Sequence, residues 1–210
     1  MANKEIQRSP GRPKQAEQEL SKQELILQTA AQLFMQHGYE PVSLQQISKA
    51  CHVTKPTIYY HFTSKSELFK AAVTIMFNNV HQHTSRLLRD AEHLEEGLLK
   101  VAEARLANPH AEIETLLREA EKFLSEEQIR EIREAENQIY EELADYFREA
   151  MERNILRKNN PMLLAQTFST MMVIGNKNET VSEYNSAAKL GKELVDIFLR
   201  GTLSGSSALL

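Results

Sequence analysis

The chain has 210 residues and 41% hydrophobic residues, enough for one large core or two smaller ones and too many for a disordered protein. Its low contents of glycine and proline (7 and 6 residues) favour an all-α protein, and no apolar run is long enough to span a bilayer. The net charge is −4, but residues 1–66 carry eight basic and five acidic residues, as expected when one end of a protein binds a polyanion.

Residues 1–20 are predicted to form a flexible basic arm, because two prolines and a glycine interrupt any helix between Ser9 and Lys14. Arg12 is a candidate for insertion into an A·T-rich minor groove, although a solvated tail that only adds positive charge explains the same residues. The arm lacks the apolar segment of a signal peptide, and Cys51 is the single cysteine. We therefore expect a reducing, cytoplasmic location.

Three helices are predicted next, over residues 22–37, 44–50 and 54–61. Ser21 with Glu24 and Ser43 with Gln46 are spaced as capping boxes, which open the first two helices. The second and third helices are separated by only a few residues, which is typical of a helix-turn-helix motif.

The residues of the third helix fall into two groups. Ile58 and Phe62 are four apart and are expected to anchor the helix to the first two. Thr54 is the predicted N-cap, and Pro56 sits in the first turn, where its missing N–H costs nothing. Packing gives no reason for the remaining polar and aromatic residues on so short a helix, whereas contact with DNA does.

The segments Val53–Phe62 and Ser64–Leu68 (VTKPTIYYHF and SKSEL) closely resemble the DNA-binding signature of TetR-family repressors. The resemblance covers about the first third of the chain, and Cys51-His52 depart from it where Ala-Gly is common. It implies contacts to base edges from Lys55, Pro56 and Thr57, and contacts to the DNA backbone from Ser43, Tyr59, Tyr60 and His61. Thr54 completes the set, together with Lys65, because a third capping box (Ser64 with Glu67) would place this lysine at a helix N-terminus, a favourable phosphate site.

We expect a three-helix DNA-binding domain at residues 21–66, a helical ligand-binding and dimerisation domain at 67–203 and a loose tail at 204–210. Helices are predicted over residues 65 to about 88, 94–107, 113–124, 126 to about 156, 162–174 and 182–200. This two-domain, all-α organisation is also what the resemblance implies.

The helix at 162–174 is apolar around most of its circumference, and the last helix has small residues four apart. Both features, together with the resemblance, favour a four-helix homodimer interface over burial within one subunit. The predicted interface residues are Phe168, Met171, Tyr184, Ala187, Gly191, Leu194, Val195 and Phe198.

A ligand pocket is expected inside the second domain, although apolar stripes of this kind form cores more often than pockets. Its candidate residues are Met76, Leu98, Leu116, Phe123, Glu136, Ile139, Tyr140, Leu143, Phe168 and Met172. Glu136 would pair with a cationic ligand if it were buried, since an unpaired buried charge is costly, but an exposed position is the expectation.

The favoured function is a homodimeric repressor that binds a palindromic operator and is released by a small, largely apolar molecule. The alternative is a DNA-binding protein of the same fold whose second domain binds a protein partner. An enzyme is disfavoured, because the sequence contains no phosphate loop, metal box or nucleophile motif, and no metal or cofactor is expected.

Overall fold

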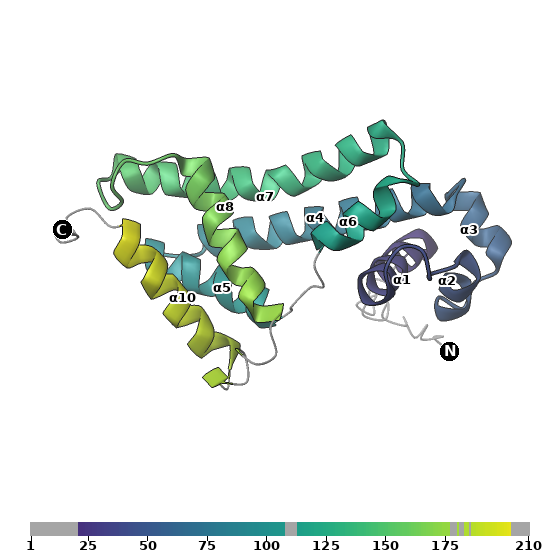
Figure 1. Ribbon diagram of the computed structural model, residues 1–210, viewed down its shortest axis with the longest axis horizontal. Coiled ribbons are helices and arrows are strands. Elements are labelled where there is room, and N and C mark those ends of the chain that lie inside the picture. Colours follow the sequence, from purple (N-terminus) through teal and green to yellow (C-terminus); the bar gives the residue numbers. More distant parts are fainter. Residues whose placement is uncertain (1–20, 108–112, 177–179, 181–182, 185, 203–210) are drawn as a thin grey trace, which may run out of the picture.

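The computed structural model describes residues 21–107, 113–176, 180, 183, 184 and 186–202, and its regular elements within these ranges are all helical (Figure 1). The predicted all-α fold is thereby confirmed. The elements are α1 (Lys22–His37), α2 (Leu44–Ala50), α3 (Lys55–His61), α4 (Lys65–Arg89), α5 (Leu94–Ala107), α6 (Ile113–Glu121), α7 (Glu126–Glu152), α8 (Pro161–Met171), the 3-10 helix η1 (Met172–Asn176) and α10 (Ala187–Thr202). The predicted arm at 1–20 and tail at 204–210 lie outside the described residues.

Local capping fixes where several helices begin. In α1 the Ser21 side chain accepts from the backbone N–H of Glu24, and the Glu24 carboxylate accepts from the Ser21 N–H in return. Ser43 with Gln46 forms the same reciprocal pair at α2. Both predicted boxes are confirmed.

The third predicted box, at Ser64, is only half formed. The Ser64 hydroxyl accepts from the Glu67 N–H at 3.0 Å, but the Glu67 carboxylate is engaged elsewhere. It accepts from the side-chain amide of Gln128 at 2.9 Å and pairs with Lys70 at 2.7 Å. Lys70 chiefly holds the pKa of Glu67 below its ordinary value, against the effect of burial and with help from Gln128. A tertiary contact has therefore replaced the local one.

Several predicted helix ends differ from the structure, and the helix expected over 113–124 already ends at Glu121. Helix α7 ends at Glu152, before the expected Leu156, because Asn154 adopts a positive φ of 56° that breaks the helix. The expected single helix at 162–174 is instead α8 followed by η1. The last helix continues to Thr202, whose hydroxyl donates to the Phe198 carbonyl at 2.9 Å.

Helices α4 and α7 lie side by side and run in the same direction along the length of the molecule (Figure 1). Glu67 contacts Gln128, Lys70 pairs with Glu131 at 2.9 Å, and His81 contacts Glu142 at 3.2 Å. The two residues of each pair are 61 positions apart in the sequence, as expected for parallel helices in fixed register. This pair of helices connects the small N-terminal helices with the opposite end, where α8 and α10 lie.

The buried residues form two clusters that share α4 and α7. The first contains α1–α3, the start of α4, and also Leu116, Leu117 and Ala120 of α6. The second contains the end of α4 with α5, α8, α10 and the rest of α7. The core beneath the helix-turn-helix therefore includes side chains from beyond residue 66. The predicted domain boundary at that residue stays a prediction.

Replacement of Phe147 by alanine should cost about 3–5 kcal/mol of unfolding free energy, because it leaves a cavity in the second core. The Phe147 ring is fully buried and lies 6.2 Å from the Phe168 ring and 5.4 Å from the Phe198 ring, centroid to centroid. Urea denaturation measures this loss. Phe123 is the control, because it is 46% exposed and its alanine variant should lose only about 1 kcal/mol, mainly from one aromatic contact. Equal losses in the two variants would contradict the placement of the core.

Candidate nucleic-acid interface

The turn between α2 and α3 holds the two helices in a fixed relation. His52 adopts a φ of 53°, the left-handed conformation that glycine adopts most easily and that histidine tolerates. The Val53 N–H donates to the Ser48 carbonyl at 2.9 Å, and the Cys51 thiol is buried. Cys51 is therefore part of the packing of this turn, and His52 adopts the conformation for which glycine is common at this position.

Helix α3 is held from one side. Ile58 is fully buried and Phe62 is 4% exposed, so both act as the predicted anchors. The Thr54 side chain accepts from the Thr57 N–H at 3.3 Å as the N-cap, and Pro56 occupies the first turn. These contacts leave the opposite face of α3 pointing to solvent at one end of the molecule (Figure 1).

The exposed face of α3 carries cationic, aromatic and hydroxyl groups. Tyr60 is 85% exposed and Tyr59 is 48% exposed, while Lys55 and Pro56 are also exposed. The Lys55 ammonium lies 5.7 Å from the Tyr59 ring centroid, and the His61 ring packs edge-on against Tyr60 at 5.0 Å. An ammonium, phenol and imidazole groups on one short helix can donate hydrogen bonds to phosphates and to base edges.

Several of the predicted DNA-contacting side chains are already engaged within the chain. The Lys65 ammonium donates to the Glu40 carbonyl at 3.1 Å and lies 4.3 Å from the Tyr39 ring centroid. Burial lowers the pKa of Lys65, and the nearby Glu40 carboxylate opposes that shift. The Thr57 hydroxyl hydrogen-bonds the Thr54 hydroxyl at 2.8 Å. Lys65 is thus not the freely extended phosphate ligand that its position in the sequence suggested.

The other predicted DNA contacts are consistent with a surface role. Ser43 is exposed at the start of α2, where its hydroxyl serves the capping box. Arg12 lies outside the described residues. The structure therefore brings the α3 residues and Ser43 to one end of the molecule, and the roles predicted for them are proposals about bound DNA.

Most of the predicted ligand-binding residues belong to the cores. The following side chains are at most 5% exposed and pack among other apolar groups: Leu98, Leu116, Ile139, Leu143, Phe168 and Met172. Met76 packs against the first core, and Phe123 is exposed beside Tyr39. A periodic apolar stripe cannot distinguish a packed core from the wall of a cavity, so contact of these residues with a ligand stays a prediction.

Glu136 is buried, contrary to the expectation of an exposed position. Its carboxylate accepts from Arg133 at 2.8 Å and from the Tyr140 hydroxyl at 3.3 Å. Arg133 also binds Glu114 of α6 through two hydrogen bonds of 2.6 and 3.1 Å. Glu114 chiefly raises the pKa of Arg133, and burial chiefly raises the pKa of Tyr140, with Glu136 adding to it. A protein cation thus neutralises Glu136, so it does not need a cationic ligand.

Several predicted dimer residues pack inside the subunit instead. Phe168, Leu194, Val195 and Phe198 are at most 7% exposed, and Gly191 lies against Ala102 and Leu106 of α5. Within the subunit these five residues pack against its own core, where α5 covers this face of α10, and their role in a subunit interface stays a prediction. Met171, Tyr184 and Ala187 are half-buried around the second core.

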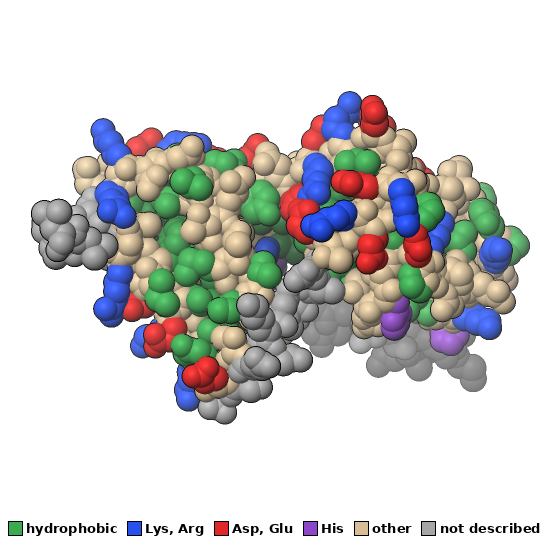
Figure 2. Space-filling view, in the orientation of Figure 1, with side chains coloured by type: hydrophobic (Ala, Val, Ile, Leu, Met, Phe, Trp, Pro, Cys, Tyr) green, Lys and Arg blue, Asp and Glu red, His purple; other side chains and the backbone are tan. Residues whose placement is uncertain are grey.

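The outward faces of the same helices carry other large apolar side chains. Leu163 of α8 is 54% exposed, Val173 of η1 is 46% exposed and Ile197 of α10 is 60% exposed. We refer to these three residues and the exposed surface around them as the α8–α10 face. Hydrophobic side chains gather over these helices in the left half of Figure 2. The predicted interface residues and these exposed side chains thus belong to the same helices but mostly to different sides of them.

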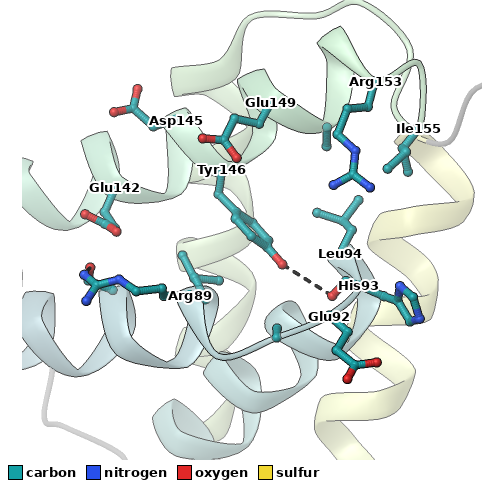
Figure 3. Close-up of a pocket in the computed structure, with 14 residues that line it drawn as sticks. Arg89, Glu92, His93, Leu94, Glu142, Asp145, Tyr146, Glu149, Arg153 and Ile155 are labelled. Atoms are coloured by element: carbon teal, nitrogen blue, oxygen red, sulfur yellow. Dashed lines mark hydrogen bonds between the residues drawn. The ribbon is translucent and has the colours of Figure 1, made fainter.

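A polar hollow of about 390 Å³ lies at the other end of the molecule from α3, between the end of α4, the start of α5 and the end of α7. Figure 3 shows Tyr146 pointing across it, where its hydroxyl donates to the His93 carbonyl at 3.4 Å. Burial chiefly raises the pKa of Tyr146, with help from Glu96 and Glu149. Arg89 and Arg153 face four acidic side chains here (Glu92, Glu142, Asp145 and Glu149), so the lining is acidic overall. No motif in the sequence indicated it.

A second hollow of about 230 Å³ lies between α4 and α5, and its walls are mainly apolar. Arg105 lines it, although the sequence reasoning did not single this residue out. The only signal in the sequence was an arginine one turn after Val101 on the apolar side of α5.

The described residues contain neither a metal-binding cluster nor a membrane-spanning helix. No group of histidine, cysteine, aspartate and glutamate side chains in them is arranged to hold a metal ion. None of the helices in the described ranges is both long and apolar enough to cross a membrane.

Residues 26–72 match the family described as "Bacterial regulatory proteins, tetR family". This match covers α2, α3, most of α1 and the start of α4, and so coincides with the interface described above. Among characterised proteins, the chain is 32% identical over 94 residues to the HTH-type transcriptional repressor ComR of Escherichia coli K12, a match that spans 44% of this chain and 42% of ComR. The chain thus spans less than half the length of the relatives it matches.

Solved structures extend the likeness to the whole fold. The reduced form of E. coli NemR superposes with a TM-score of 0.71 at 19% identity, over 89% of this chain and 100% of NemR. AibR, solved in complex with isovaleryl coenzyme A and operator DNA, superposes with a TM-score of 0.63 at 20% identity, over 84% of this chain and 97% of AibR. At these identities the likeness concerns the arrangement of the helices alone.

Proposed function

Because this chain belongs to the TetR family of bacterial regulatory proteins, we propose that it is a homodimeric transcriptional repressor that a small molecule releases from its operator. Two subunits would insert their α3 helices into successive major grooves on one face of a palindromic site, roughly 34–36 Å apart. The observation that carries the proposal is the division of α3 into a buried side, with Ile58 and Phe62, and an exposed side, with Lys55 and Tyr60.

The α8–α10 face is the proposed dimer interface. Leu163, Val173 and Ile197 are large apolar side chains left in solvent by a subunit whose other apolar groups are mostly packed. A second copy of the same face would cover them by a twofold, self-complementary contact. This assignment keeps the predicted pair of helices and moves the contact to their outward sides.

A connection between the second domain and the reading helix supports control by a ligand. In the segment after α6, Lys122 forms an ion pair with Glu40, and the Phe123 ring lies 5.1 Å from the Tyr39 ring. Glu40 in turn accepts the hydrogen bond from Lys65, the first residue of α4. A shift of α6 would therefore be transmitted to the junction between α3 and α4. A ligand would release the DNA if it preferred the shifted conformer.

A mobility-shift titration with the DNA upstream of the chain's own gene tests this function. The expected result is a complex with two chains per duplex that competitor DNA of scrambled sequence does not displace. Binding that an equal amount of scrambled DNA abolishes would contradict a sequence-specific regulator.

Exchanges of Lys55 for alanine and Thr57 for valine should change which operator bases are preferred, because both side chains are expected at base edges. Each lost contact should reduce discrimination at one position by about 1–3 kcal/mol. Tyr60→Phe, which removes one hydroxyl, should instead weaken binding to all sequences alike. Affinities measured for a set of single-base operator variants distinguish the two patterns, and identical base profiles for all three proteins would contradict the assignment.

A further inference from the structure

Arg105 is a half-buried cation on α5 that has no carboxylate in direct contact among the described residues. Among the described carboxylates, Glu136 acts electrostatically on the Arg105 guanidinium, but it already accepts hydrogen bonds from Arg133 and Tyr140. Arg105 itself forms no direct ion pair with any carboxylate in the described part of the chain. Burial lowers the pKa of its guanidinium, while Tyr140 and Glu136 oppose that shift. Even a lowered arginine pKa leaves the group charged near neutral pH.

The guanidinium lies at the wall of an apolar hollow. Val80 and Leu87 of α4 face Val101 and Ala104 of α5 across about 230 Å³, with Arg105 on one side. Asn79 and His83 line the same hollow and are exposed, which places its opening at that rim. A half-buried cation beside an apolar space is partly desolvated, and the carboxylate of an anionic ligand would compensate that loss of solvation.

We propose that this hollow is the effector site of the repressor and that it binds a small carboxylate with an apolar tail. The ligand's carboxylate would accept two hydrogen bonds from Arg105, and its tail would occupy the space between α4 and α5. The size suits a medium-chain or single-ring acid, because a cavity of about 150 Å³ holds benzene. That this ligand acts as an effector rests on the proposed function. Its binding to the free chain does not, because that binding requires no DNA.

The site is placed where occupancy can alter α4. Val80 and Leu87 belong to α4, which begins at Lys65, four residues after the end of α3 at His61. A tail held between α4 and α5 would fix the separation of these two helices. The same ligand could therefore favour one orientation of α4, as differential binding to one conformer requires.

Calorimetric titration of the free chain with three eight-carbon probes tests the ligand class. Octanoate, octan-1-ol and octylammonium share the tail and differ in the head group. Octanoate should bind about tenfold or more tightly than octan-1-ol, as expected for a charge-assisted hydrogen bond, and octylammonium should bind more weakly than either. Equal affinities of octanoate and octan-1-ol, or no binding of octanoate, would overturn the proposal.

Variants locate the binding. Arg105→Gln should lose the preference for octanoate, Arg105→Lys should retain part of it, and the control Arg86→Gln on the exposed side of α4 should leave it unchanged. Ala104→Leu should exclude all three probes by filling the hollow, which keeps the test valid if the Arg105 variants unfold. Undiminished octanoate binding by either Arg105→Gln or Ala104→Leu would overturn the site. Failure to bind operator DNA in parallel mobility shifts would overturn the proposed function alone.

Discussion

Exchange of Leu163 and Ile197 for glutamate is expected to convert the dimer into monomers and to lower operator affinity by about 10³-fold. The two side chains are 54% and 60% exposed in the subunit, so the exchange should leave the fold intact. In the proposed dimer each glutamate would be buried against apolar groups without a partner, which is strongly unfavourable. A single subunit would then read one half-site with an affinity close to nonspecific binding, which is typically about 10³-fold or more weaker.

Sedimentation velocity reports the change in assembly, and the mobility-shift titration reports the change in affinity. Gln138→Glu and Lys158→Glu together form the control, because both residues are exposed and neither belongs to α8, η1 or α10. A dimer that persists in the Leu163 and Ile197 variant would show that another surface joins the subunits.

Removal of the Lys55 and Tyr60 side chains together should lower operator affinity by about 100-fold without loss of stability. Both are exposed on α3 and neither contributes to the buried anchor of Ile58 and Phe62. Contacts of this kind contribute about 1–3 kcal/mol each to the recognition of a base pair or a phosphate. The measurement is fluorescence anisotropy with labelled operator DNA, accompanied by urea denaturation of the same variant.

The control variant removes another lysine side chain and a tyrosine hydroxyl outside α3, as Lys189→Ala with Tyr146→Phe. The control should bind DNA as the parent does, because both residues lie in the second domain. If both double variants bound equally well, α3 would not be the reading helix.

Local signals in the sequence were sufficient for the first third of the chain. The capping residues Ser21 and Ser43 define helix starts through contacts only three residues away, so a single sequence contains the full signal. The anchors Ile58 and Phe62 were found for the same reason, since their spacing alone assigns them to one side of α3. This is the part that positions the candidate interface.

Contacts between segments that are distant in the sequence could not be predicted from local patterns. Lys65 is engaged by the backbone carbonyl of Glu40, a group that every residue possesses and that no pattern indicates. Glu136 is buried beside Arg133, which lies one turn away and also hydrogen-bonds Glu114 of α6. The last helix shows an apolar side whatever covers it, so periodicity could not tell contact with α5 from contact with a second subunit.

Hydroxyl-radical footprinting of the chain on its own upstream DNA tests the central claim most directly. Two subunits that each place the exposed side of α3 in a major groove should protect two segments on one face of the duplex. The account predicts that the centres of these segments lie about one helical turn, or a multiple of it, apart, and that the Lys55 and Tyr60 double variant loses both. A single protected segment, or protection that persists in that variant, would contradict it.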